Sequence, residues 1–174
     1  MKKNASGFTL IELLAVIVVL AIVILMASMA IIPRMNEARK QVFAMEANEA
    51  INAASSFFMN GEVTGSGRSF PVSEGGFECV SIADLVANGD FKGKDYEGAV
   101  RVEKHGNSYL YTISMTNKKL QVNQKGVEGT KTNDSNDNRK SVDITAANVE
   151  DYKAPTNDGQ GFKLPEGCQI TTNP

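Results

Sequence analysis

The side chain most able to do chemistry in this sequence is Glu12, because of where it lies. It is the only charged residue between positions 8 and 32, where Thr9 and Ser28 are the only other polar side chains. An ionisable group in a membrane helix costs roughly 2.5–3.5 kcal/mol at the centre and less near an end, so it usually indicates a function and a partner. An acid near a helix N-terminus is also favoured, by about 0.3–1 kcal/mol. Glu12 could therefore act through a cationic partner, by capping, or both.

Catalytic and metal-binding motifs are weak throughout. His105 is the only histidine, and its neighbours Lys104 and Gly106 predict a solvated turn residue and not a general base. Oxygen ligands alternate as in a calcium loop at Asp134, Asn136 and Asn138. However, Arg139 stands where such a loop needs glycine, and Thr145 where it needs the closing glutamate. The sequence therefore predicts no enzymatic activity, no metal site and no cofactor.

The two cysteines, Cys79 and Cys168, form an even pair that could make a disulfide in an exported chain. Whether they bond depends on whether the fold brings them together. The sequence leaves that question open.

The overall charge excludes one class of partner. Across 174 residues, 18 Lys and Arg are set against 20 Asp and Glu, with no clustered basic stripe. Binding to nucleic acid needs several cations on one face to neutralise phosphates. Nucleic acid is therefore not expected as a primary partner.

The apolar segment, residues 8–32, is long enough to cross a bilayer as a helix. Lys2 and Lys3 precede it and should stay in the cytoplasm, which delivers the chain after residue 32 to the outside. An ordinary secretory signal fits poorly, because its apolar region is about 7–15 residues long and ends at a small-residue cleavage site. A plain signal anchor remains an alternative.

The residues around Glu12 also carry a resemblance. The run Gly7-Phe8-Thr9-Leu10-Ile11-Glu12 and the apolar residues after it resemble the class III signal of type IV pilins over residues 2–32. The amino-acid sequence of this run resembles that of Gram-positive pilins most. The resemblance implies that a prepilin peptidase cuts between Gly7 and Phe8, removing the leader 1–7, and that Phe8 becomes N-methylated. It also implies that Glu12 faces the amine of Phe8 in a neighbouring subunit, which would offset part of the desolvation cost of both charges and set the register of assembly.

The remaining pattern predicts an α+β fold. Pro33 should kink or locally break the helix without ending it. Apolar residues then recur at helical spacing at Ala44, Ala47, Ile51, Ala54 and Phe58, and Gly61 is predicted to end the helix. We expect one long N-terminal helix whose apolar half protrudes and whose amphipathic half, 33–60, packs on a sheet.

The rest of the predicted headgroup, 33–174, is a loop at 61–98 followed by a sheet and C-terminal region at 99–174. A short capped helix is expected within 80–91. Strands are predicted at 99–104, 108–115 and 120–124, in a three- to four-stranded antiparallel sheet. Residues 125–138 should be a polar surface loop, and 141–151 an ordered element, helix or strand.

These observations predict a structural subunit and not an enzyme. By resemblance it would be a type IV pilin, with a major pilin as the leading hypothesis, that self-associates into a helical filament for adhesion, surface motility or biofilm formation. Its partners would be the prepilin peptidase and the pilus assembly machinery. It would reside in the cytoplasmic membrane before assembly and on the cell surface afterwards. The alternatives are a minor or competence pilin, a type II secretion pseudopilin, or a membrane-anchored binding domain that never polymerises.

Overall fold

The computed structural model describes residues 9–65, 69–93, 95–133, 136–156 and 159–169. The chain forms two compact units, Met1–Arg39 and Lys40–Pro174. The helices in chain order are α1 (Leu10–Thr64), α2 (Ile82–Ala87) and the 3-10 helix η1 (Ala146–Asn148). The strands are β1 (Phe77–Ser81), β2 (Glu97–His105), β3 (Ser108–Thr116), β4 (Leu120–Lys125), β5 (Val127–Glu128), β6 (Lys131–Asn133), β7 (Asn136–Asp137), β8 (Lys140–Ser141) and β9 (Glu150–Asp151).

Helix α1 belongs to both units and departs from the prediction at two points. It continues through Pro33, so the local break that the sequence allowed does not occur. It also continues past Gly61, which is buried within the helix, and ends at Thr64. The second compact unit starts at Lys40, shortly before Phe43, the first buried side chain of α1 among the described residues.

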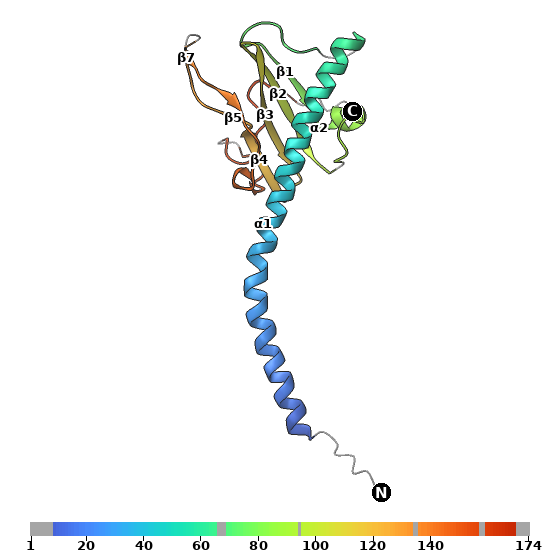
Figure 1. The fold of residues 1–174 in the computed structure, drawn as a ribbon, viewed down its shortest axis with the longest axis vertical. Helices are drawn as coiled ribbons and strands as arrows, with labels where there is room; N and C mark the ends of the chain where they lie inside the picture. Colours follow the sequence, from blue (N-terminus) through green and yellow to red (C-terminus); the bar gives the residue numbers. More distant parts are fainter. Residues whose placement is uncertain (1–8, 66–68, 94, 134–135, 157–158, 170–174) are drawn as a thin grey trace. The chain divides into compact units, whose positions relative to one another are not determined.

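The core of the second unit lies between the later part of α1 and the sheet (Figure 1). The predicted helical stripe is buried as expected, except that Ile51 is only partly covered. Phe43, which the sequence pattern did not single out, is 1% exposed and contacts Tyr96 edge to face, with ring centroids 5.7 Å apart. Burial of these apolar side chains is the main source of stability for the unit.

The sheet confirms the predicted antiparallel arrangement and extends it. Its strand order is β1-β2-β3-β4-β9, so it has five strands where three to four were expected. The three predicted strands correspond to β2, β3 and β4 in hairpin connection. The two additional strands pair at the edges, β1 along β2 and β9 with Leu120 and Gln121 of β4. The sequence analysis missed β1 and left the segment that contains β9 undecided, because the pairing of both strands depends on partners distant in sequence.

The two helix predictions outside α1 have different outcomes. The short capped helix is present as α2, where the Ser81 hydroxyl accepts a hydrogen bond from the Asp84 backbone N–H at 3.0 Å. The undecided segment 141–151 contains both kinds of structure, η1 and β9, with Ile144 and Val149 buried.

The predicted surface loop at 125–138 contains short paired strands instead, since β5 pairs with β8 and β6 with β7.

Candidate functional site

Glu12 lies in the first turn of α1 and forms a capping box with Thr9. Its Oε2 accepts hydrogen bonds from the Thr9 backbone N–H and hydroxyl, both at 2.8 Å. The Glu12 backbone N–H donates in return to Thr9 Oγ1 at 3.4 Å. This reciprocal pair satisfies backbone donors that a helix start leaves unpaired. In the isolated subunit, the carboxylate of Glu12 therefore has a partner within its own chain.

The helix that follows presents an apolar surface without cover. The large apolar side chains from Leu10 to Met26 are all exposed, from 47% at Ile22 to 84% at Leu10. The most apolar 18-residue window of α1 has a mean hydropathy of 3.2 and contains no buried residue, and it is long enough to cross a membrane. Such a surface is stable only in lipid or against other apolar surfaces.

The two residues predicted to form the processing site, Gly7 and Phe8, lie outside the described residues. The structure therefore places Glu12 and its cap but not the proposed cleavage point or the amine that cleavage would create.

A second cluster of charged side chains lies on β2 and was not recognised in the sequence. Arg101, Glu103 and His105 alternate along the strand and so share one face. Arg139 joins this cluster from the chain after β7: its Nη2 donates to Glu103 Oε1 and to Asp137 Oδ2, both at 2.7 Å. Arg101 donates to the other Glu103 oxygen at 2.6 Å. Arg139 thus ties the β6–β7 hairpin to the sheet.

The guanidinium groups control the ionisation of this cluster. Burial opposes the charged form of Glu103, but the hydrogen bond from Arg139 and the charges of Arg101 and Arg139 keep the pKa of Glu103 below its ordinary value. Hydrogen bonding from Arg139 likewise holds the pKa of Asp137 well below its usual range. Both carboxylates are therefore ionised at neutral pH and stabilise the folded state.

We expect Arg139→Gln to destabilise the protein by about 2 kcal/mol at pH 7, the scale of hydrogen bonds to a buried charge. Because both folded-state pKa values are lowered, this stabilisation is fully present above the unfolded pKa values of about 4 and is lost as the pH falls below them. The difference between wild type and variant should therefore shrink below about pH 4. Denaturant unfolding of the full chain at a series of pH values measures it.

The matched control is Lys118→Gln, which removes a Lys118–Glu97 ion pair of 2.6 Å whose side chains are 65% and 60% exposed. Exposed pairs contribute little, so this variant should unfold like the wild type at every pH. A destabilisation by Arg139→Gln that stays constant down to pH 2 would contradict the assigned role of the carboxylates.

His105 differs from its prediction as a solvated turn residue. It is the last residue of β2, and its side chain is only 21% exposed, with Nδ1 3.5 Å from Asp137 Oδ2 and 3.7 Å from Glu74 Oε1. The sequence could not show this, because Asp137 is distant in the chain.

The two cysteines, left open by the sequence, are joined in the structure. A disulfide connects Cys79 of β1 to Cys168 near the C-terminus, across a separation of 89 residues. Cys79 thus lies in a strand and not in the expected loop. As for metals, the part of the chain that the structure describes holds no group of three His, Cys, Asp or Glu side chains suited to an ion. Asp134, from the rejected calcium pattern, lies outside that part.

Comparison with known proteins identifies the N-terminal segment. A family model described as the prokaryotic N-terminal methylation motif matches residues 2–28. No curated protein and no solved structure matches the chain. The matched residues contain the Gly7-Phe8 junction, Glu12 and most of the apolar segment, and the motif implies processing by a prepilin peptidase. The chain thus carries a type IV pilin-like class III signal peptide, which supports a type IV pilin-like or pseudopilin protein.

Proposed function

We propose that this protein is a structural, non-enzymatic subunit of a type IV pilus that polymerises through its N-terminal helix into a surface filament. The observation that carries the proposal is the uncovered apolar surface from Leu10 to Met26, which lies within the matched methylation motif and contains Glu12 as its one charged residue. Before assembly, lipid would cover this surface. In the filament, the same surface on neighbouring subunits would cover it.

Glu12 is the proposed register determinant of that filament. A carboxylate among apolar helices needs a cation, and the amine of a cleaved Phe8 in a neighbouring subunit is of the right sign. A subunit one helical turn out of step would leave one charge unpaired. Self-association would then be specific in register although the apolar surfaces themselves are not.

The proposed location follows from the same helix. The subunit would be held in the cytoplasmic membrane with its N-terminus inside and would reach the cell surface in the filament, where adhesion, motility and biofilm formation are the roles open to it. A minor pilin or a secretion pseudopilin would share the motif and the helix. The amount of this protein in filaments sheared from cells separates these candidates, because a major pilin should be the most abundant subunit of those filaments.

Intact-mass measurement and N-terminal sequencing of the protein from its native cells test the proposal. We expect a chain that starts at Phe8 and carries one additional methyl group. Gly7→Leu, which alters the residue before the proposed cut, should retain Met1 and yield no filaments. A native protein that keeps Met1 and is never recovered in sheared filaments would contradict the proposal and favour a membrane-anchored binding domain.

A further inference from the structure

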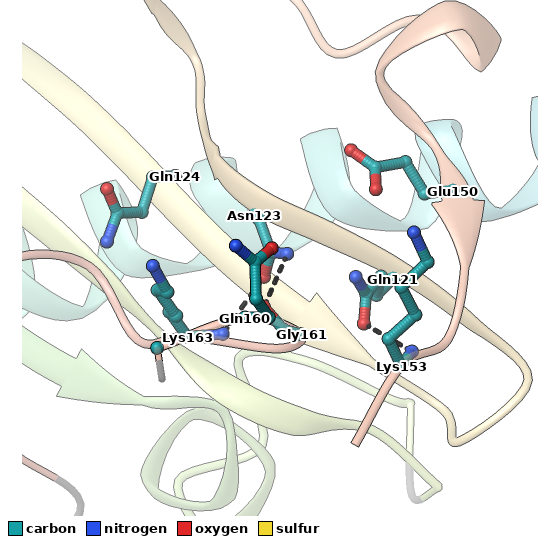
Figure 2. Close-up of a pocket in the computed structure, with 9 residues that line it drawn as sticks. Gln121, Asn123, Gln124, Glu150, Lys153, Gln160, Gly161 and Lys163 are labelled. Carbon is teal, nitrogen blue, oxygen red and sulfur yellow. Dashed lines mark hydrogen bonds between the residues drawn. The ribbon is translucent and has the colours of Figure 1, made fainter. Parts of the chain in front are cut away.

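A polar pocket of about 290 Å³ lies between β4 and the C-terminal part of the second unit. Figure 2 shows the nine residues that line it, and none of them has an aliphatic or aromatic side chain. They are Gln121, Asn123, Gln124, Glu150, Lys153, Gly159, Gln160, Gly161 and Lys163. The amide, ammonium and carboxylate groups of these side chains offer hydrogen bonds that a polar ligand can use. The pocket therefore suits a hydrophilic ligand.

Side chains of β4 hold the opposite wall of the pocket in place. Asn123 donates to the Gly161 carbonyl at 3.2 Å and accepts from the Lys163 backbone N–H at 3.1 Å. Gln124 donates to the Leu164 carbonyl at 2.8 Å, and Gln121, itself buried, accepts from the Lys153 backbone N–H at 3.0 Å. Because these amides tie the two walls together, the pocket keeps its width without a ligand.

The charges in the pocket differ between its two ends. Figure 2 shows Lys163 near Gln124 at one end, Lys153 near Glu150 at the other, and Gln160 between them. Among the residues that line the pocket, Lys153 therefore has a carboxylate near it and Lys163 does not. Gly159 lies beside this ammonium, since a Cβ added at Gly159 would lie in ordinary contact with Lys163 Nζ, at 3.6 Å.

We propose that this pocket binds a sugar that carries one carboxylate, such as a uronic or sialic acid residue of a surface polysaccharide. The carboxylate would lie at the Lys163 ammonium, because charge-assisted hydrogen bonds are the strongest that a lysine makes. Ring hydroxyls would lie toward Gln160 and Glu150, since amides and carboxylates offer the donors and acceptors that hydroxyls pair with. Glu150 disfavours a polyanion, whose further charges it would repel.

This site acts without polymerisation, so it can be tested on the unassembled subunit and can fail while the proposed filament function stands. The probes are galacturonic acid and its neutral counterpart galactose, titrated into full-length protein in detergent and followed by saturation-transfer NMR. We expect galacturonic acid to bind in the millimolar range and about tenfold more tightly than galactose, the effect of one charge-assisted contact. Lys163→Gln should remove that preference.

The matched control is Lys119→Gln, which removes the same charge from an exposed residue in the turn between β3 and β4. It should bind both sugars like the wild type. Equal binding of the two sugars, no binding of galacturonic acid at about 10 mM, or an unchanged preference in Lys163→Gln would each overturn the proposal. Tighter binding of heparin than of galacturonic acid would overturn it too, by assigning the pocket to polyanions.

Discussion

Replacing Glu12 with alanine should leave the subunit cleaved and inserted in the membrane but lower its recovery in sheared filaments by about tenfold or more. The expected loss is large because the apolar segment contains no other charged side chain to specify register. Without Glu12, each added subunit could bind in more than one axial register. Small losses in the free energy of correct addition would therefore accumulate along the filament. Immunoblots of membrane and sheared fractions measure both quantities in the same cells.

Two further variants separate the charge of Glu12 from its capping role. Glu12→Gln keeps an oxygen that can accept hydrogen bonds from Thr9 but removes the charge. Thr9→Val removes the hydroxyl that donates to Glu12 at 2.8 Å and keeps the charge. If an ion pair sets register, Glu12→Gln should lose filaments as Glu12→Ala does, and Thr9→Val should retain more filament than either. Normal filaments from Glu12→Gln would refute the ion-pair role and leave only the cap.

Removing the disulfide with Cys79→Ser and Cys168→Ser together should destabilise the second unit by about 4 kcal/mol. The bond closes a separation of 89 residues, and cross-links over long loops restrict the unfolded chain most. The bond also holds the C-terminal residues to β1, an edge strand paired only with β2. The midpoint of thermal unfolding should fall by roughly 10–15 °C.

Circular dichroism of the full chain in detergent measures this shift, and a reductant provides its control. Adding the reductant to wild type should reproduce the lower midpoint, whereas the double serine variant should not respond to it. If wild type and variant unfold within about 2 °C of each other, a margin below 1 kcal/mol for a unit of this size, the bond contributes nothing measurable and the C-terminal part is held by its hydrogen bonds alone.

Local patterns were sufficient for those elements whose stabilising contacts are local or periodic. The helical spacing of Ala44, Ala47, Ala54 and Phe58 predicted the buried face of α1 because the period of a helix is the same in any fold. The three central strands were predicted since short turns connect them and no distant partner is needed. Ser81 likewise marked the start of α2 through a bond within its own turn.

Predictions failed where distant contacts override local propensity. Gly61 reads as a helix stop, but burial keeps it within α1. The segment that forms β1 has no local strand signal strong enough to stand apart from its Gly- and Ser-rich surroundings, and its pairing with β2 makes it a strand. In the sequence, Arg139 was considered only as the residue that breaks the calcium-loop pattern. In the fold it donates a hydrogen bond to Glu103, which lies 36 positions earlier in the chain.

The sequence by itself determined the N-terminal end of this protein: the class III signal motif, the apolar segment and the place of Glu12 within it depend only on residue type and linear order. The capping box of Thr9 and Glu12 belongs to the same class, since its two residues are only three positions apart. Only the tertiary structure decided the pairing of Cys79 with Cys168, the Arg139 cluster and the pocket at Lys163. Each of these joins residues that are far apart in the chain, and their meeting depends on the packing of the whole second unit.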